Sequence, residues 1–471
     1  MSHFGLDKSK ENLFKKTLEE ILKSIKPSTK QTSEEQKFVD LLLKRIKDTP
    51  GKHIDAIVAG SFARNTNLKD NKDFDIFVLY PPTLDRREFV EEGLLLGREV
   101  FKGYFCEKVF SEHPYTRGII DNYVIEVVPA YKIQDTSLLI SSVDRTPFHS
   151  VFISKNIKSK QKDDVRLLKF FLKTINCYGS DSEVNGFSGY LCELLVLYYG
   201  DFQGVLEAAS NWNLPLSLNL EIEDKKNKEN ENNQEAVETE ANKTFNEPFV
   251  FIDPVDKNRN VASAVEIEQI SKFTAASRSF LQNPITDFFN KLNSKKFSYT
   301  QFITWLDNYP TCALEFDVKG LTKDIIWSKL KKNAKKIIAN LEANDFNILK
   351  NGFCYSDEES KAYLFIMVDS LTLPKLKIHL GPKVEDIVNS QNYLDNTIAT
   401  LGPYIKQDRW YSIKLRPRID IKDVIMEFAF KNTDLPMKIF TKEEVKSLFL
   451  GNTNLASNFA DFYSSKEKFL L

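Results

Sequence analysis

Two aspartates at the head of an apolar run are the residues of this sequence best suited to chemistry. Asp73 and Asp75 stand two positions apart in the run DFDIFVLY. Residues i and i+2 of a β-strand point to the same face, so both carboxylates should project together. Such a pair suits hard cations that prefer oxygen ligands, Mg²⁺ above all. The pattern predicts a magnesium site at the start of a strand, although a single Asp-x-Asp is also common as ordinary surface charge.

A glycine-serine pair upstream and an isolated acid downstream extend this site. Gly60-Ser61 ends the stretch HIDAIVAGS, and a turn there exposes N–H groups and a hydroxyl that can hold phosphates. Glu126 lies among apolar residues in NYVIEVVPAY, where a charge is costly unless a cation pairs with it. A third carboxylate would complete a two-metal site. Asp121 is a weaker candidate for that role because it precedes the strand.

The elements that must position these residues form a mixed sheet with helices on it. The sequence predicts strands at 53–61, 74–80 and 122–131, and a helix at 86–102. Residues 11–47 show the apolar spacing of two amphipathic helices separated by Pro27 and Ser28, with Thr32 or Ser33 as the N-cap of the second.

From Asp163 onward the pattern changes to long helices, and after residue 345 to short β-rich runs. Helices are predicted at 165–174, 187–199, 263–283, 284–293 and 321–343. The β-rich runs are YLFIMV, KLKIHL, WYSIKLRP and DVIMEFAF. At 471 residues the chain is too long for a single core, so we expect an α+β protein of three or four domains.

Composition excludes several classes of protein. Five single cysteines and five dispersed histidines form no zinc motif, and they favour reduced thiols in the cytoplasm. No apolar run approaches the length of a membrane span, and the charged N-terminus is unlike a signal peptide. The segment 221–247 holds nine acidic and four basic residues, so the rest of the chain carries +4 rather than −1. Its polarity predicts a disordered loop.

The ordered series of motifs resembles the archaeal-type (class I) CCA-adding tRNA nucleotidyltransferases of the DNA polymerase β superfamily. After GSFARNT and DFDIFV the likeness continues through VIEVVPAYKI, DRTPFH, VRLLKFFLK, CYGSDSEVNGFSGYLCELLVLYYGDF and FIDPVDKNRNVAS, covering most of residues 30–285. It extends more weakly through WSKLKKNAKK and HLGPKV. The Gly-Gly-x-x-Arg pattern with which class II enzymes open is absent.

The resemblance implies a role for each matching residue. Asp73, Asp75 and Glu126 would be the catalytic metal ligands for Mg²⁺. The triphosphate of the incoming nucleotide would be bound by Ser61, Arg64, His149, Lys169 and Tyr178. Arg259 would help read its base. These side chains suit the roles, because Arg and Lys neutralise phosphate charge and a Tyr hydroxyl can donate to an oxygen.

The resemblance also implies a domain plan and an activity. Residues 1–146 would be the catalytic head and 147–290 a helical neck with the insertion 221–247. Residues 291–344 and 418–471 would form a body that binds RNA, and 345–417 a tail that binds the stem and elbow of tRNA. The implied enzyme is a cytoplasmic monomer or homodimer without a membrane segment. It would add C, C and A to the 3′ end of tRNA from CTP and ATP.

Two basic stretches suit the acceptor and T stems of tRNA, which proteins grip mainly through phosphates and 2′-hydroxyls. Residues 321–342 carry six lysines beside an apolar side. Residues 403–422 add Lys406, Arg409, Lys414, Arg416, Arg418 and Lys422, with Trp410 and Tyr411 interleaved. An ordinary solvated helix face is an equal explanation for the first stretch.

The sequence departs from the family pattern at two places. The third carboxylate is usually Asp, whereas Glu126 is longer by one methylene, and the insertion 221–247 has no counterpart in the motifs. A poly(A)- or oligoadenylate-forming relative shares the same Gly-Ser and Asp-x-Asp core. A tRNA-binding relative that has lost catalysis is the third alternative, against which the retained acids argue.

Overall fold

A computed structural model describes residues 8–110, 112–220, 245–290, 299–357, 359–440, 442–451 and seven positions beyond them (455, 458, 462, 463, 467, 469 and 470). Most of the segment 221–247 therefore lies outside the described residues. The chain forms two compact units, residues 1–292 with 467–471, and residues 293–466. Among the described helices, none has both the length and the hydropathy needed to cross a membrane.

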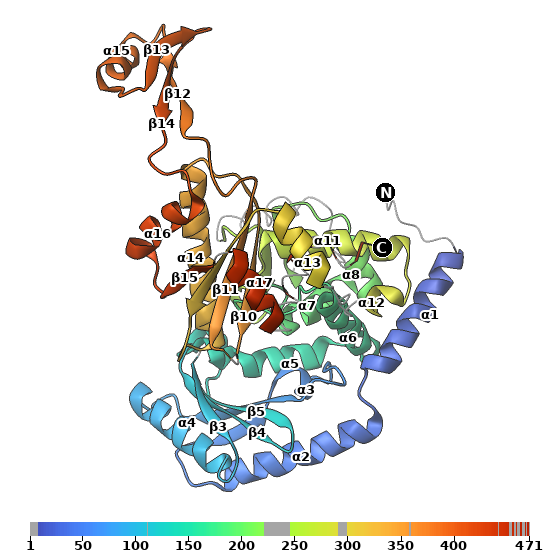
Figure 1. The fold of residues 1–471 in the computed structure, drawn as a ribbon. Helices are drawn as coiled ribbons and strands as arrows, with labels where there is room; N and C mark the ends of the chain where they lie inside the picture. The colour runs from blue at the N-terminus through green and yellow to red at the C-terminus, as the bar shows by residue number, and fades with distance from the viewer. Residues whose placement is uncertain are drawn as a thin grey trace. The chain divides into compact units, whose positions relative to one another are not determined.

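A five-stranded mixed sheet forms the first part of unit one (Figure 1). Its order is β1-β2-β5-β4-β3, with β2 and β5 parallel and the other neighbours antiparallel. The strands are β1 (Asp55–Val58), β2 (Asp73–Tyr80), β3 (Cys106–Phe110), β4 (Pro114–Ile120) and β5 (Tyr123–Tyr131). The mixed sheet predicted from the sequence is confirmed.

The two faces of this sheet differ because strand residues alternate in direction. One face packs against α2 (Thr29–Asp48) and α4 (Arg86–Val100) through Phe74, Ile76, Ile125 and other buried residues. The opposite face carries Asp73, Asp75 and Glu126. The predicted N-cap of the second helix is wrong, because α2 begins at Thr29 and the side chain of Ser28 accepts the backbone N–H of Gln31.

The rest of unit one is mainly helical and has a core rich in phenylalanine. Phe171, Phe202, Phe273 and Phe280 are fully buried in it. The helices are α1 (Lys8–Ile25), α3 (Gly60–Ala63), α5 (Thr146–Asn156), α6 (Ser159–Thr174), α7 (Gly189–Tyr199), α8 (Phe202–Ala209), α11 (Ile267–Gln282) and α12 (Asp287–Asn290), with 3-10 turns η1 (Thr136–Leu138) and η2 (Ser142–Arg145). A small sheet joins β6 (Leu216–Leu218), β7 (Phe249–Asp253) and β8 (Asp256–Asn260).

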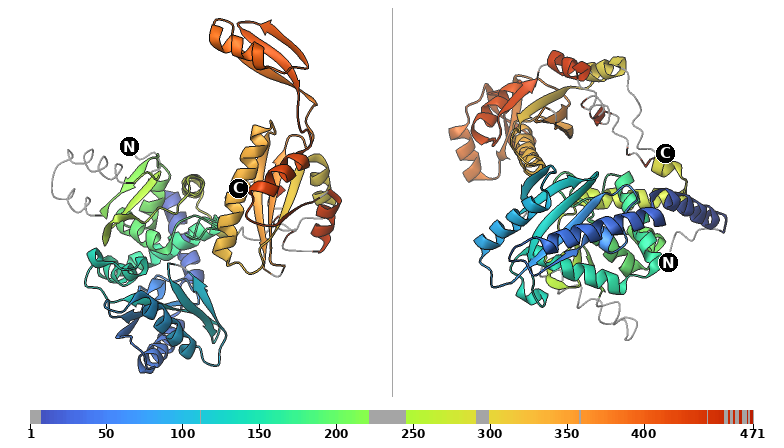
Figure 2. Two further views of the ribbon diagram at one scale, coloured as in Figure 1. Left: turned by 90° about the vertical axis from the view of Figure 1, so that its left-hand side faces the viewer. Right: turned by 90° about the horizontal axis from the view of Figure 1, so that it is seen from below.

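Unit two holds a four-stranded antiparallel sheet (Figure 2). A hydrophobic core lies on each of its faces. Its order is β10 (Ile348–Ser356), β11 (Lys361–Val368), β9 (Thr311–Asp317) and β15 (Met437–Phe440). Along β11, Leu364 and Ile366 face one core while Tyr363 and Phe365 face the other. The first core includes α14 (Lys323–Ala343) and α16 (Ile421–Asn432), and the second α13 (Tyr299–Asn308) and α17 (Lys442–Gly451).

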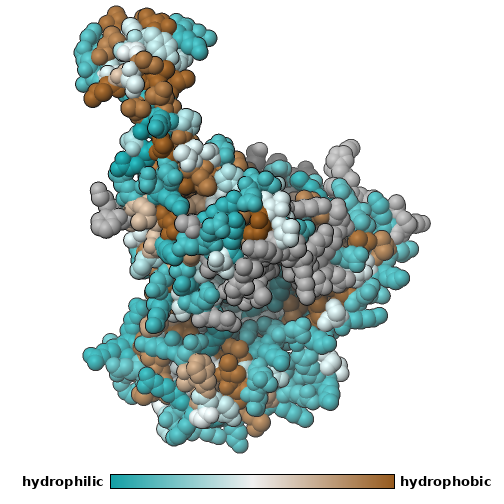
Figure 3. All heavy atoms as spheres, viewed as in Figure 1, coloured by the Kyte–Doolittle hydropathy of each residue, from teal (hydrophilic) through white to brown (hydrophobic). Residues whose placement is uncertain are grey.

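A second, smaller sheet in unit two is built from residues 376–415. Strand β14 (Arg409–Leu415) lies between β12 (Leu376–Lys383) and β13 (Leu401–Lys406), and α15 (Ile387–Asn396) packs on β12. Apolar side chains remain exposed on this part, where Figure 3 shows brown patches. Ile387 and Ile398 are among the exposed residues.

Two expectations about unit two need revision. DVIMEFAF was predicted as β-rich, but it lies in helix α16, which begins after the N-cap Asp420 and buries Val424, Ile425 and Ala429 at helical spacing. Residues 348–368, placed with the tail by the sequence, belong to the sheet of β9 and not to that of β12–β14, because β10 pairs with β11 and β11 pairs with β9. The division into four domains otherwise stays a prediction.

Candidate active site

The parallel pairing of β2 with β5 brings the three predicted metal ligands to one face of the sheet. Asp75 is the register partner of Glu126, and Asp73 lies two residues before Asp75 on the same strand. Asp73 is exposed, whereas Asp75 and Glu126 are half-buried. Asp121 lies at positive φ in the turn before β5, as an exposed residue outside this face. The geometry therefore favours Glu126 over Asp121.

The three carboxylates repel one another. Burial raises the pKa of Asp75, and the nearby charge of Asp73 adds to the rise. Burial and then Asp75 likewise raise the pKa of Glu126, against the opposing effects of Arg117 and Tyr115. The Glu126 Oε1 atom lies 3.6 Å from Arg117 Nε and accepts the Tyr115 hydroxyl at 3.3 Å. This face therefore concentrates negative charge that a cation would relieve.

The oxygen atoms of Asp73, Asp75 and Glu126 are chemically suited to bind a metal ion. Three carboxylates on one face, of which Asp75 and Glu126 have raised pKa values, are the donor set that a hard divalent cation prefers. Within the described parts of the chain, no three acidic, His or Cys side chains already stand close enough to enclose an ion. The role of these residues as metal ligands stays a prediction.

Gly60 lets the chain pass directly beneath Asp75. It has φ +70°, and a Cβ atom at this position would lie 2.0 Å from Asp75 Oδ2. The short helix α3 begins at Gly60, separated from the end of β1 by one residue, so Ser61 lies in its first turn and is half-buried. The glycine of the Gly-Ser pair is thus required by both its backbone conformation and its closeness to a carboxylate.

Two of the predicted phosphate-binding cations converge on a buried acid, Glu193 of α7. Arg64 Nε lies 2.8 Å from Glu193 Oε2, and Lys169 Nζ lies 3.6 Å from Glu193 Oε1. Lys169 also donates to the Thr66 hydroxyl at 3.1 Å, and that hydroxyl donates to Glu193 at 2.5 Å. Burial lowers the pKa of Lys169, while Glu193 opposes the change. We call Arg64, Thr66, Lys169 and Glu193 the Glu193 cluster.

Tyr178 lies beside the Glu193 cluster. A Cβ atom on Gly189 would lie 3.1 Å from the Tyr178 hydroxyl and 3.6 Å from Lys169 Cε, so both side chains pass close to this glycine. Lys173 Nζ lies 5.3 Å from the Tyr178 ring centroid. Burial raises the pKa of Tyr178, which keeps its hydroxyl protonated as a donor. The structure thus brings Arg64, Lys169 and Tyr178 together.

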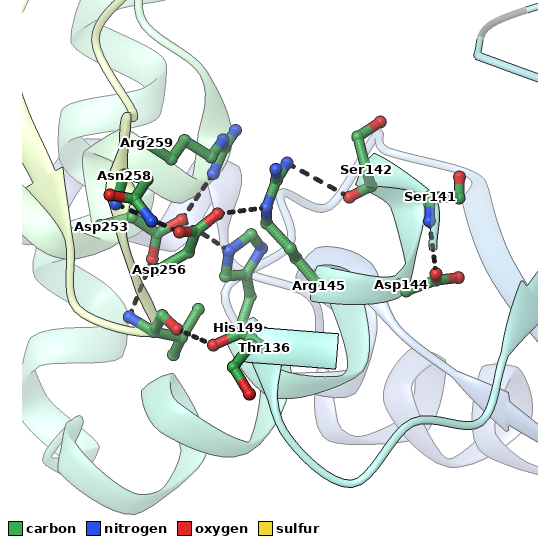
Figure 4. Close-up of polar contacts among 12 residues, drawn as sticks. Thr136, Ser141, Ser142, Asp144, Arg145, His149, Asp253, Asp256, Asn258 and Arg259 are labelled. Carbon is green, nitrogen blue, oxygen red and sulfur yellow. Dashed lines mark hydrogen bonds and ion pairs between the residues drawn. The ribbon is translucent and has the colours of Figure 1, made fainter. Parts of the chain in front are cut away.

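The other two predicted nucleotide-binding residues meet at a second buried acid, Asp253, at the end of β7 (Figure 4). His149 Nε2 donates to Asp253 Oδ2 at 2.8 Å, and Arg259 Nη1 donates to the same oxygen at 2.8 Å. The Tyr190 hydroxyl donates to Asp253 Oδ1 at 3.1 Å, and its ring stacks on His149 with centroids 4.0 Å apart. We call these four residues the Asp253 cluster.

The charges in the Asp253 cluster favour an ionised acid. Burial alone would raise the pKa of Asp253, but hydrogen bonds from His149 and then Arg259 hold the pKa below its usual value. Burial lowers the pKa of His149, so the ring is neutral and donates through Nε2. Arg259 keeps a third of its side chain exposed to solvent, although one of its nitrogens is bonded to Asp253.

Sequence reasoning missed the two acids that hold these residues. Glu193 is the single charged residue in the apolar helix sequence YLCELLVLYY. A lone charge in such a helix indicates a buried ion pair, so the sequence could have predicted this one. Asp253 lies in the quoted FIDPVDKNRN motif, but only the fold shows that it meets His149. A further ion pair in Figure 4 joins Arg145 Nε to Asp256 Oδ2 at 2.7 Å.

Arg166 of α6 ties the helical part of unit one to the loop after α3. Its Nε donates to the Asn67 carbonyl at 2.9 Å, and its Nη2 donates to the Asn65 carbonyl at 2.7 Å. Asp163 pairs with its Nη1 at 2.7 Å. The loop that carries Arg64 and Thr66 is therefore held from α6.

Comparison with known domain families agrees with this arrangement. The model of the nucleotidyltransferase domain matches residues 39–149, and that of the second domain of tRNA nucleotidyltransferases matches 163–290. The model of the C-terminal domain of CCA-adding enzymes matches 309–439. With its mixed sheet and row of acids, the protein is a nucleotidyltransferase. The nucleotidyltransferase superfamily generally uses a divalent metal ion.

Whole-length relatives define the family. The CCA-adding enzyme of Methanocaldococcus jannaschii is 35% identical over 384 residues, covering 80% of this chain and 83% of that protein. The CCA-adding enzyme of Sulfolobus acidocaldarius is 32% identical over 420 residues, covering 88% of this chain and 91% of that protein. The chain therefore belongs to the family of CCA-adding enzymes, and the resemblance seen in its motifs is confirmed.

Solved structures give a more distant likeness. A Cid1 poly(U) polymerase bound to magnesium and 3′-dATP is 16% identical, with a TM-score of 0.44, and the match covers 59% of this chain and 98% of that one. A cytoplasmic RNA terminal U-transferase matches at 16% identity and a TM-score of 0.43, covering 61% of this chain and 96% of that one.

Proposed function

We propose that this enzyme adds C, C and A to the 3′ end of tRNA without a nucleic-acid template, using CTP and ATP and releasing pyrophosphate. The observation that carries the proposal is the register of Asp75 with Glu126 beside Asp73, on one face of a nucleotidyltransferase sheet in a chain of this family. The 3′-hydroxyl of the RNA attacks the α-phosphate of each nucleotide in turn.

Asp73, Asp75 and Glu126 would hold Mg²⁺ in this proposal. When bound, the metal supplies positive charge that activates the attacking hydroxyl and stabilises the leaving pyrophosphate. Tyr115 and Arg117 keep the longer Glu126 side chain on the catalytic face. Glu126 then serves in place of the Asp that is usual in the family.

The nucleotide would lie between the sheet and the helices that hold the two clusters. Ser61 and Arg64 bind the triphosphate from α3 and the loop after it, and Tyr178 donates a hydroxyl from the helical side. Lys169 balances the charge of Glu193, and His149 is oriented by Asp253. Catalysis of this kind consists mostly of positioning and charge neutralisation, without a covalent intermediate.

Base choice would rest on Arg259 together with the RNA end. Arg259 is anchored to Asp253 through one Nη atom while a third of its side chain stays exposed, an arrangement that presents donors in a fixed direction. A base of the wrong kind leaves a donor or acceptor without a partner, at a cost of about 1–3 kcal/mol.

The RNA would be gripped beyond its tip by unit two. The α14 lysines and the basic residues of 403–422 suit the phosphates of the acceptor and T stems. A cytoplasmic location and the division into head, neck, body and tail are also part of the proposal.

A tRNA without its last three nucleotides tests the proposed function. The enzyme is incubated with this RNA, Mg²⁺ and each labelled nucleoside triphosphate, alone and in pairs. Two additions from CTP, one from ATP and arrest after the third are expected. Continued growth of a homopolymer would assign the enzyme to a poly(A)-forming activity instead, and no incorporation at all would make it a tRNA-binding relative.

A further inference from the structure

The catalytic face of the head sheet continues two strands beyond Glu126. Arg117 of β4 is the register partner of Glu126, and Glu107 of β3 is the register partner of Arg117. Directly opposed residues of neighbouring strands project to the same face. Asp75, Glu126, Arg117 and Glu107 therefore form one row across four neighbouring strands.

Two large apolar side chains stand exposed beside this row. Ile119 lies two residues after Arg117 on β4, and its backbone N–H bonds to the carbonyl of Phe105 at 3.2 Å, which extends the pairing of β3 with β4. Phe105 is 68% exposed, Ile119 48% and the Arg117 side chain 44%. We call Phe105, Arg117 and Ile119 the β3–β4 patch.

The residues of β4 that point to the other face of the sheet are buried. Thr116 and Ile120 of β4 are buried, and α4 approaches Thr116 so closely that a Cβ on Gly97 would lie 2.3 Å from its hydroxyl. The β3–β4 patch thus belongs to the face that carries the acids, not to the face that α4 covers.

The order of the strands indicates whether the nucleoside triphosphate or the acceptor RNA lies next to the β3–β4 patch. Ser61 and Arg64, the proposed triphosphate residues, follow β1 on one side of the acids, and β4 and β3 lie on the other side. Phosphoryl transfer places the attacking and leaving oxygens roughly in line. The acceptor must therefore approach from the side opposite the pyrophosphate, which is the β3–β4 side.

We propose that the β3–β4 patch binds the terminal nucleotides of the acceptor RNA, with Phe105 and Ile119 stacking on a base and Arg117 contacting a phosphate. This inference rests on the proposed function and names the place where its RNA substrate ends. Aromatic stacking and arginine contacts are the means by which proteins hold unpaired RNA ends regardless of sequence. The site would serve each of the three additions, because stacking tolerates any base.

The same strand supplies a matched control. Phe110 is also exposed, at 58%, but it lies on the other face of β3, where Lys108 Nζ approaches its ring at 4.6 Å. Phe105→Ala and Phe110→Ala remove the same side chain from opposite faces. Phe105→Tyr retains the stacking surface. Arg117 is left unchanged because it touches Glu126.

The test uses the full-length enzyme and a tRNA acceptor minihelix that ends in 2-aminopurine, the fluorescence of which falls on stacking. Phe105→Ala should reduce the quenching on binding and raise KM for the RNA roughly tenfold, the effect of one lost stacking contact. The KM for CTP should stay within about twofold. Phe110→Ala should behave as wild type, and Phe105→Tyr should restore both readouts.

Two outcomes would overturn the inference without touching the proposed function. One is a wild-type KM and wild-type quenching in Phe105→Ala. The other is an equal loss in Phe105→Ala and Phe110→Ala, which would mark a general weakening of β3. Absence of nucleotide addition by the wild-type enzyme would instead remove the proposed function itself.

Discussion

Buried charges hold the residues of the site in place. Lys169 and Glu193 are almost wholly buried, and Arg64 is 7% exposed. Removing such ions from water costs several kcal/mol each, which only close partners offset. The site therefore depends on acids that need not touch a substrate, and those acids are where substitutions should have the largest effects.

Glu193→Gln should destabilise the protein by about 3 kcal/mol, because it leaves Arg64 and Lys169 buried without an anionic partner. Urea unfolding at pH 7 measures the change. Glu99→Gln is the control, since Glu99 pairs with Lys102 at the surface, where both side chains are at least 60% exposed. There we expect a change of about 0–1 kcal/mol. Equal effects of the two substitutions would show that Glu193 does not balance buried charge.

Glu126→Gln should lower the rate of nucleotide addition about 10²–10³-fold, the usual effect of losing one stabilising group at a transition state. Its amide keeps the size of the side chain but loses the charge. Glu126→Asp shortens the reach toward Tyr115 and Arg117 by a methylene and should retain much more activity. Single-turnover rates with saturating RNA and CTP measure both. Wild-type rates in Glu126→Gln would remove it from the metal site.

Arg259→Ala should reduce the preference for CTP over UTP and for ATP over GTP more than it reduces the overall rate. The expected loss is about 1–3 kcal/mol of discrimination, since one set of base contacts disappears. Asp253→Asn should act in the same direction with a smaller effect, because it weakens the anchor of Arg259. Competition between paired nucleotides gives the ratio. A uniform loss for all four nucleotides would contradict a role in base choice.

At the scale of elements, the sequence was most informative where apolar spacing was regular. The strands at 74–80 and 122–131 and most of the long helices appear where the sequence predicts them. The run DVIMEFAF was misread because Val424, Met426 and Phe428 also alternate as a strand would. The preceding Asp420, which accepts the backbone N–H of Lys422, is the helix signal that decides it.

The partners of buried groups were beyond reach of the sequence, because they depend on packing between distant segments. Glu193 meets Thr66 across 127 positions, and His149 meets Asp253 across 104. No local propensity encodes such contacts. The pairing of β2 with β5 is of the same kind, and it alone shows that Asp75 and Glu126 are neighbours.

One buried acid on α6 predicts a pH dependence of stability. Burial raises the pKa of Asp164 to about 6, well above its ordinary value of 3.8. Well below pH 3.8 the Asp164 carboxyl is protonated in both the folded and the unfolded chain. Between pH 4 and 6 Asp164 is ionised in the unfolded chain but still mostly protonated in the folded protein. The contribution of the protonated carboxyl to the free energy of unfolding is therefore lost as pH rises toward 6.

Asp164→Asn cannot ionise and should abolish this loss. The free energy of unfolding of the variant, relative to wild type, should rise by about 1–3 kcal/mol between pH 4 and pH 7. Because the variant is compared with wild type at each pH, the effects of the other titrating groups cancel. Any pH-independent cost of the amide cancels as well when the two pH values are compared. Urea unfolding at the two pH values measures it. A difference that does not change with pH would mean that the pKa of Asp164 is the same in the folded and unfolded chains.

At the scale of the whole molecule, the distribution of charge matters more than its sum. The net charge is −1, yet the segment 221–247 alone holds nine acids and four lysines. Several basic residues of unit two also have internal partners. Arg416 lies 3.5 Å from Asp345 and is 14% exposed, and Lys336 donates to the Asn432 carbonyl at 3.2 Å. Arg416 is therefore the weaker candidate for binding RNA, and the lysines of the exposed face of α14 are the stronger.

The pair Lys331→Glu and Lys332→Glu on α14 tests whether unit two grips RNA. Lys332 pairs with Asp434 at 3.2 Å, but both side chains are more than 40% exposed, so the loss of this pair costs little stability. If the helix faces phosphates, binding of tRNA should weaken and the slope of log affinity against log salt should flatten by about 1–2. The pair Lys15→Glu and Lys16→Glu on α1 changes the net charge equally and should leave the slope near that of wild type. Filter binding from low to high salt measures both, and unchanged affinity of the α14 variant throughout would remove this helix from the RNA interface.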